Sequence, residues 1–321
     1  MLQMDTPTSQ AQANAPAARF DICLSQLTAG TFAYGQLAAF SDLSREHLRQ
    51  LNHSWLVIAL PIRRRLIADA IELAEENVHY RFDRLYRFAL SDPNEEIRQL
   101  AISGLWEDET RSLLLELIEI SQEDTSQDVR AAAISFLGDA VARLRSAGDD
   151  ADLGDRINEL VMHFCGDKTL STLIRRRAIE AVGGLEQTAE TRQVILDAYQ
   201  HGDQTLEAGA IEAMGRSHES RWRPLVLPIL RSADAELRFE AARALGRIGT
   251  GDDVPDLSEL TLDDDPDVRG AAIHALGDLG GPGAVRVLRN LAADAPESDR
   301  EAIEDAIDSA MLANDPIRTP A

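Results

Sequence analysis

The chain of 321 residues is poor in cysteine and in long apolar segments, and both shortages exclude classes of protein. Its two cysteines, Cys23 and Cys165, lie far apart in sequence, which argues against a disulfide framework and favours reduced thiols. The longest strongly apolar run, residues 55–62, is much shorter than the roughly 20 residues that cross a bilayer. We therefore expect no membrane insertion. No basic residue precedes Arg19 and no apolar core follows the first residues, so we also expect no signal peptide and a cytoplasmic protein.

Basic charge is scarce as well. The 32 Lys and Arg residues are outnumbered by 55 Asp and Glu residues, which gives a net charge of −23, and Lys168 is the only lysine. A nucleic-acid ligand requires a concentrated basic face, so we expect none. The acidic surface instead favours a protein or peptide partner, in particular one with a basic patch. The apolar content of 44% is sufficient for a folded core.

The sequence does contain an internal repeat. Six segments align column by column: 94–106, 126–138, 171–183, 203–215, 234–246 and 265–277. Apolar residues stand at offsets 0, 4, 5 and 8 of each segment, which places them on one face of an α-helix. A second amphipathic stretch follows each segment, so the pattern predicts helix pairs. One pair cannot bury its apolar face alone, and the pairs must therefore stack.

Two columns of small residues accompany the apolar ones. The residue at offset 4 is alanine in all six segments, which indicates close approach of a neighbouring helix. A glycine column lies near the end of five segments, at Gly138, Gly183, Gly215, Gly246 and Gly277. Because glycine readily adopts the left-handed conformation that ends a helix, we expect these glycines to terminate their helices.

This pattern resembles HEAT repeats, in particular the short type named after phycobilisome lyases. Residues 265–280 (DPDVRGAAIHALGDLG) are similar to that consensus and residues 234–249 nearly so. The resemblance implies an all-α fold, a right-handed α-solenoid (superhelix) of about seven HEAT-like helix pairs with an irregular N-terminal helical cap. The expected organisation is a flexible tail at 1–18, the cap at 19–78, the repeat solenoid at 79–311 with an insertion at 141–155, and a second flexible tail at 312–321.

The insertion predicts a longer helix followed by an acidic loop. Asp149, Asp150, Asp152 and Asp155 suggest calcium, but twelve residues counted from Asp150 end at Val161, where an EF-hand requires glutamate. We interpret the loop as a solvated segment without a metal.

An arginine follows the first apolar residue in five of the six segments. These residues are Arg98, Arg130, Arg175, Arg238 and Arg269. We interpret them as a structural ladder, in which each arginine binds carboxylates and turn carbonyls of its own or the next repeat. Acids in the preceding turns lie within plausible reach, namely Glu95, Asp128, Asp234 and Asp267. Glu207 replaces the arginine in the fourth segment, and we expect it to pair with one arginine of the triplet 175–177.

The exposed stripe of the repeated helices, the second helix of each pair, is the candidate partner-binding surface, since such helices commonly line the binding face of a solenoid. The candidate contacts are Arg176, Glu180, Glu212, Phe239, Arg243 and His274. Phe239 is equally consistent with a partner anchor and with packing on a neighbouring repeat.

These features favour a non-enzymatic scaffold or assembly adaptor without cofactor, metal or catalytic residue. The resemblance leaves an enzyme or accessory as the alternative: a bilin-lyase-like chromophore chaperone or, less favoured, a deoxyhypusine-hydroxylase-like oxidoreductase. The His-Glu metal ligands of the latter are missing, because the corresponding helix positions hold pairs such as Phe239-Glu240. The one His-Glu dipeptide, His218-Glu219, falls in a predicted turn. His163 and Cys165 lack two further ligands and are interpreted as packing residues.

Overall fold

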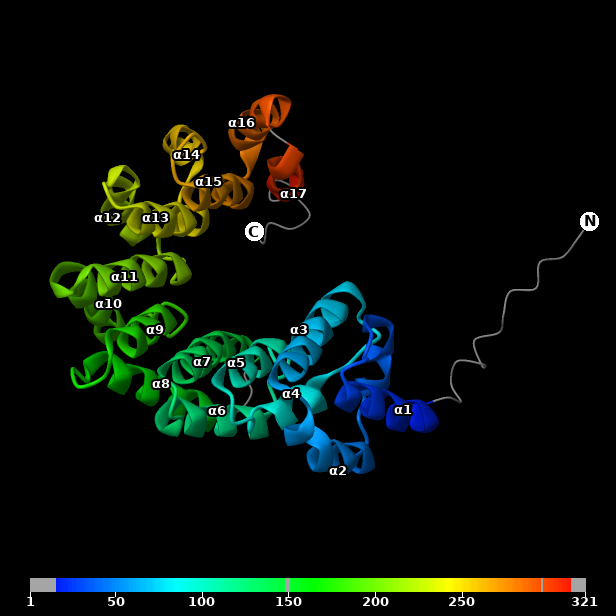
Figure 1. Cartoon of the computed structure of the whole chain (residues 1–321). Coiled ribbons are helices and arrows are strands. Elements are labelled where there is room, and N and C mark those ends of the chain that lie inside the picture. The colour runs from blue at the N-terminus through cyan, green and yellow to red at the C-terminus, as the bar shows by residue number, and fades with distance from the viewer. Residues whose placement is uncertain (1–15, 148–150, 296, 313–321) are drawn as a thin grey trace, which may run out of the picture. The chain divides into compact units, whose positions relative to one another are not determined.

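The computed structural model describes residues 16–147, 151–295 and 297–312 (Figure 1). Every regular element within these ranges is an α-helix or a 3-10 helix (η), which confirms the all-α prediction. The elements up to residue 147 are α1 (Pro16–Ala29), η1 (Tyr34–Phe40), α2 (Arg45–Ser54), η2 (Trp55–Val57), α3 (Leu60–Glu76), α4 (Asp83–Ala89), α5 (Glu95–Gly104), α6 (Arg111–Glu123) and α7 (Gln127–Ala147). The remaining elements are α8 (Ala151–Gly166), α9 (Thr172–Val182), α10 (Ala189–His201), α11 (Gln204–Arg216), η3 (Ser220–Trp222), α12 (Arg223–Val226), η4 (Leu227–Arg231), α13 (Ala235–Ile248), η5 (Gly251–Asp253), α14 (Val254–Leu260), α15 (Pro266–Leu279), α16 (Gly281–Asp294) and α17 (Glu297–Leu312).

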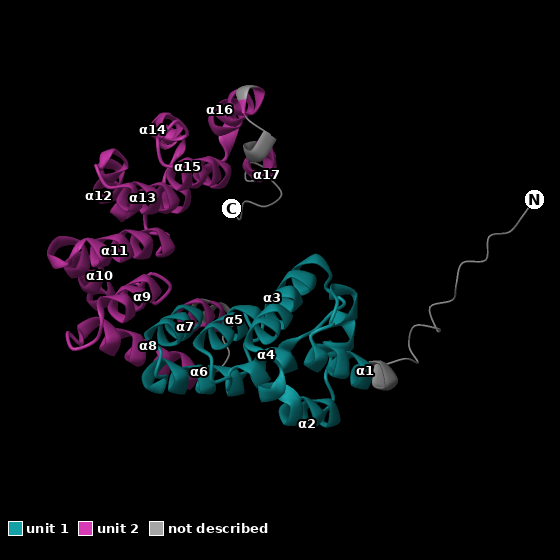
Figure 2. Cartoon of the chain, viewed as in Figure 1, with its two compact units in different colours: residues 1–136 teal, residues 137–321 magenta. Residues whose placement is uncertain are grey.

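The chain divides into two compact units, residues 1–136 and residues 137–321 (Figure 2). Helix α1 begins at Pro16, before the expected end of the tail at residue 18. In the insertion, α7 is long and continues to Ala147, but α8 already begins at Ala151. Residues 151–155 are therefore helical rather than part of the expected acidic loop, whereas residues 148–150 lie outside the described residues. Most of the two expected tails at 1–18 and 312–321, namely residues 1–15 and 313–321, also lies outside them.

Each aligned segment forms one helix, and these are α5, α7, α9, α11, α13 and α15. A polar side chain starts most of them by accepting a backbone N–H that no helical carbonyl can reach. Asp203 Oδ1, for example, accepts from the Leu206 N–H at 3.0 Å, and Asp234 Oδ1 accepts from the Leu237 N–H at 3.1 Å. In the second unit the repeated helices follow one another, with α9 against α11, α11 against α13, α13 against α15 and α15 against α17.

The glycine column has a different role from the one expected. Gly138, Gly215, Gly246 and Gly277 lie inside their helices, and positive φ angles among the described glycines occur at positions 30, 280 and 281 instead. A Cβ atom on Gly215 would lie 2.7 Å from Ala244 Cα in the next repeated helix, and one on Gly246 would lie 2.9 Å from Ala275 Cα. These four glycines are therefore needed for contact between successive repeats. Gly183 does follow the last residue of its helix, but with φ of −59° rather than in the expected left-handed conformation, and a Cβ there would also meet the next repeated helix, at the Ala213 carbonyl oxygen.

The first unit has an aromatic core at its N-terminal end. The Phe20 ring stacks on His47 with centroids 4.3 Å apart and meets Phe40 edge-on at 5.3 Å. Closer to the repeats, the buried Asp92 carboxylate accepts hydrogen bonds from Trp55 Nε1 and Arg63 Nη1, both at 2.6 Å. The N-terminal cap is thus tied to the first repeat by a buried ion pair as well as by apolar packing.

The arginine column makes contacts along the chain in each unit. Arg98 forms a two-bond fork on Asp124, with Nε at 2.8 Å and Nη2 at 2.7 Å, while its Nη1 donates to the Asp92 carbonyl. Arg238 forms the same fork on Asp263, both bonds at 2.7 Å, and Arg269 donates to the carbonyl of that aspartate.

The carboxylate partners of Arg98 and Arg238 belong to the next repeat, one of the two positions expected, and not to the turns that precede their own helices. They lie in the turn before the following helix, and the nearer acid Asp234 caps its own helix. Arg130 binds the Ser121 carbonyl at 2.9 Å. Arg175 differs from the others, because its buried Nε has no hydrogen-bond partner among the described residues.

Candidate functional site

The charged side chains on the exposed stripe of the second unit include an arginine that extends across the neighbouring repeated helix. Arg176 on α9 donates from Nε to Glu180 Oε1 at 2.8 Å and from Nη1 to Glu236 Oε1 at 2.5 Å, although Glu236 lies on α13. Its path runs over α11 at Gly209, where a Cβ atom would lie 3.0 Å from Arg176 Cγ. The absence of a side chain at Gly209 lets one arginine link three successive repeats.

A second group of charges continues the network toward α15. Arg243 Nη1 lies 3.3 Å from Glu240 Oε2 and 3.4 Å from Glu212 Oε2, and Arg247 Nη1 donates to Glu212 Oε1 at 3.0 Å. The Arg243 guanidinium also lies over the Phe239 ring, 5.5 Å from its centroid. This contact makes the ring a platform for the arginine and restricts both side chains.

The structure brings the six predicted contact residues into one neighbourhood but gives them different roles. Glu180 and Glu212 are buried, with 6% and 7% exposure, so they hold arginines in place rather than face a partner. Arg243 remains partly exposed, and Phe239 and His274 line a surface pocket. Among the described residues, Glu207 forms no ion pair with the triplet 175–177 as expected, and Arg176 and Arg177 bind Glu180 instead.

The surroundings of Glu240 in this network disfavour the ionised form of its carboxyl group. The residue is 5% exposed, and Arg176 Nη2 approaches its Oε1 at 3.3 Å. Burial, followed by the negative charge of Glu212, raises the pKa of Glu240 to about 7. The site therefore contains a carboxyl group that can change its charge near neutral pH.

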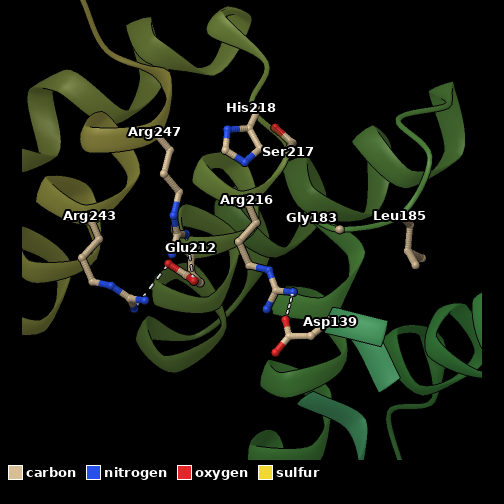
Figure 3. Close-up of a pocket in the computed structure, with 10 residues that line it drawn as sticks. Asp139, Gly183, Leu185, Glu212, Arg216, Ser217, His218, Arg243 and Arg247 are labelled. Atoms are coloured by element: carbon tan, nitrogen blue, oxygen red, sulfur yellow. Dashed lines mark hydrogen bonds and ion pairs between the residues drawn. The ribbon is translucent and has the colours of Figure 1, made fainter. Parts of the chain in front are cut away.

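A pocket of about 720 Å³ opens beside this network, and we call it the arginine pocket (Figure 3). It is lined by Asp139, Gly183, Gly184, Leu185, Glu212, Arg216, Ser217, His218, Arg243 and Arg247. The opening arises because α9 ends at Val182 and is followed by two glycines, whereas α11 continues to Arg216. Arg216 reaches across the gap and binds Asp139.

A second pocket of about 410 Å³ adjoins the first, and we call it the phenylalanine pocket. It is lined by Phe239, Arg243, Arg247, Pro266, Asp267, Gly270, Ala271, His274, Ala275 and Asp278. Its floor is open at Gly270, since no atom lies within 4 Å of a Cβ placed there. Arg243 and Arg247 line both pockets and so mark where they meet.

Several residues of this site were missed by the sequence reasoning. Arg247 could have been found, because it follows Arg243 by four positions on the same helix face. Glu236 and Glu240 could have been found in the same way, because they precede Arg243 on the same helix by seven and three positions. Asp139 and Arg216 are 77 positions apart, and no sequence pattern relates them.

The described residues offer no ready chemistry for metal binding. No group of three His, Cys, Asp or Glu side chains in these ranges is placed to hold a metal ion. Burial raises the pKa of the Cys165 thiol to about 12, so this thiol is protonated at neutral pH and packs as an apolar group. Glu219 of the His-Glu dipeptide is engaged by Arg192, with Oε2 2.8 Å from its Nε.

Stacked helix pairs joined by small-residue contacts define a helical-repeat protein. Residues 223–308 match the family model of HEAT repeats, which confirms the prediction of HEAT repeats for this part of the chain. No curated protein matches the sequence. None of the helices in the described part of the chain has the length and apolar character needed to cross a membrane.

Solved structures give three further comparisons. The Escherichia coli protein YibA is 19% identical, with 97% of this chain and 99% of that chain covered and a TM-score of 0.39. The complex of CpcE and CpcF of phycocyanin lyase from Nostoc is 15% identical, with coverage of 71% and 94% and a TM-score of 0.45. Human deoxyhypusine hydroxylase, in complex with glycerol, is 15% identical, with coverage of 95% and 100% and a TM-score of 0.32.

Proposed function

We propose that the chain is a non-enzymatic scaffold or assembly adaptor that binds a protein or peptide on the repeated helices of its second unit. The supporting observation is the pair of adjoining pockets, whose linings include the candidate contacts Glu212, Phe239, Arg243 and His274 and which share Arg243 and Arg247. Arginine and aromatic side chains are the groups that contribute most to binding at protein interfaces. Buried glutamates fix the arginines beforehand, which reduces the entropy lost when a partner binds.

The charge of the chain bears on how a partner approaches. A net charge of −23 favours, at long range, a partner with a basic patch, since opposite charges speed up encounter. This attraction acts over the whole surface and is screened within about 8 Å at physiological salt. Contacts inside the two pockets depend on their own side chains instead.

Site-specific photo-crosslinking in the source cell tests this proposal. A photoreactive phenylalanine analogue replaces Phe239 or His274 in the full chain, and the same analogue at Glu259, an exposed position on α14, serves as the control. This route is preferable to amine crosslinkers because Lys168 is the only lysine. The same protein captured at positions 239 and 274 but not at 259 would support the proposal. No capture at positions 239 and 274, together with capture when the analogue is placed instead in residues 141–155 or the first 78 residues, would contradict it.

The chromophore-chaperone alternative requires a deep apolar groove with several aromatic rings. The two pockets are lined mainly by arginines, carboxylates and small residues, and Phe239 is their one phenylalanine, tyrosine or tryptophan. We therefore favour the scaffold. An absorption band in the visible spectrum of protein purified from its source would favour the chaperone instead.

A further inference from the structure

The guanidinium groups around the arginine pocket retain unused hydrogen-bond donors. In the described contacts Arg243 and Arg247 each use only Nη1, and Arg216 uses only Nη2. A guanidinium carries five N–H donors, so Nε and the other Nη nitrogen of all three remain without an acceptor among the described residues. The side chain of Arg243 is 37% exposed, that of Arg247 is 27% exposed and that of Arg216 is 19% exposed, so all three are accessible to a ligand.

The pocket is locally positive within an acidic protein. Its lining contains three arginines but two carboxylates, Glu212 and Asp139, and Glu212 is already engaged by Arg243 and Arg247. A small anionic group would therefore be attracted at contact distance. An extended polyanion such as a nucleic acid would be opposed by the surrounding net charge of −23.

The backbone is left-handed at the edge of the pocket. His218 has φ of +53°, a left-handed conformation that costs a non-glycine residue on the order of 1 kcal/mol. It occupies the position just after α11 where glycine is the favoured residue. The imidazole lines the pocket beside the arginines and adds a further polar group there (Figure 3).

The adjoining phenylalanine pocket offers a different environment. Phe239, Ala271 and Ala275 give it apolar surface, and Gly270 leaves room for an incoming group. Because Arg243 and Arg247 belong to both pockets, groups bound in the two would be close enough to belong to neighbouring residues of one peptide.

We propose that the two pockets read an acidic–apolar peptide segment of the partner, with an aspartate or glutamate carboxylate in the arginine pocket and an adjacent apolar side chain in the phenylalanine pocket. A carboxylate is favoured because its two oxygens match the planar fork of a guanidinium. The inference rests on the proposed function and specifies the chemistry of the bound segment.

Selection of random heptapeptides displayed on phage, against the full chain, tests the inference. We expect the selected peptides to carry Asp or Glu within two positions of a large apolar residue. In synthetic copies, Asp→Asn or Glu→Gln should weaken binding about tenfold or more, measured by fluorescence anisotropy, because a charge-assisted pair is lost. Failure to select any peptide, or selection of basic peptides, would overturn the inference. Tighter binding, by about tenfold, of a phosphoserine copy would assign the pocket to phosphate instead.

Variants of the chain separate binding from folding. Arg247→Gln should weaken the selected peptide about tenfold, whereas Arg231→Gln, the same change at an exposed position on η4, should not. His218→Gly is the sharper test, because glycine relieves the left-handed strain while it removes the imidazole. We expect an unchanged or higher Tm together with binding weakened about threefold. Binding by both pocket variants that equals the wild type would refute the inference.

The photo-crosslinking experiment distinguishes this failure from failure of the proposed function. Crosslinks at positions 239 and 274, combined with selected peptides that lack an acidic residue, would retain the binding surface and reject the carboxylate. No crosslinks at positions 239 and 274, together with failure to select any peptide, would reject the binding surface as well.

Discussion

Replacement of Glu240 by glutamine tests how much the buried negative charge of this residue destabilises the folded protein. The Glu240 carboxyl is buried next to the carboxyl of Glu212, and its contacts with Arg176 and Arg243 are both long, at 3.3 Å. Glutamine keeps the shape of the side chain and mimics the protonated carboxyl at every pH. The variant therefore differs from the wild type mainly by the cost of ionising Glu240.

The sign and size of the effect follow from the pKa of Glu240. In the folded protein it is raised from 4.5 to about 7, so between these values the folded state binds more protons than the unfolded state. The stability of the wild type should fall as the pH rises through this window and level off above it. A shift of this size corresponds to at most about 3 kcal/mol, of which roughly 2 kcal/mol appears between about pH 5 and pH 8.

Urea denaturation followed by circular dichroism measures the free energy of unfolding of both proteins at about pH 5 and about pH 8. We expect the stability of Glu240→Gln relative to the wild type to increase by about 2 kcal/mol toward the higher pH. Glu259→Gln, the same change at an exposed site on α14, should show no comparable trend. A variant that is destabilised to the same extent at both pH values would show that the arginines keep Glu240 ionised, and the reasoning would be wrong.

Two further predictions concern packing and buried charge. Gly215→Ala should destabilise the protein by about 1–3 kcal/mol, because the new Cβ would meet Ala244 Cα at 2.7 Å. Gly270→Ala is the control and should stabilise the protein by about 0.5–1 kcal/mol, because the position has open space around it. Thermal unfolding measures both variants, and equal effects would refute the packing role of the glycine column. Asp92→Ala should destabilise the folded protein by about 3–5 kcal/mol, because Arg63 would be left buried without its carboxylate partner. Urea denaturation measures the free energy of unfolding, and a decrease of less than about 1 kcal/mol would contradict the prediction.

The sequence predicted the local structure of the repeats well, for a physical reason. Apolar residues at helical spacing and a capping residue before each run act within one helix, so their consequences can be read without knowledge of the partners. The glycine column shows the limit of such reasoning. Gly215 near a helix end is compatible both with a left-handed cap and with close contact, and only the position of Ala244 in the next repeat decides between them.

The candidate site was predicted in part. Arg243 and Phe239 could be placed on the exposed stripe from helical geometry, but the burial of Glu180 and Glu212 could not. Glu180 is held by Arg176, which lies across Gly209, and Glu212 is held by Arg243 and Arg247 of the next repeated helix. These are arrangements between repeats that no single helix specifies.

By itself the sequence determined that this protein is a stack of amphipathic helix pairs with acidic character, because side-chain periodicity and charge count are properties of the chain alone. Tertiary structure decided which carboxylates each arginine binds, that a shortened α9 opens a pocket beside α11, and that His218 adopts a left-handed backbone at its edge. These features arise from distances between residues of different repeats, and such distances exist only once the repeats have packed together.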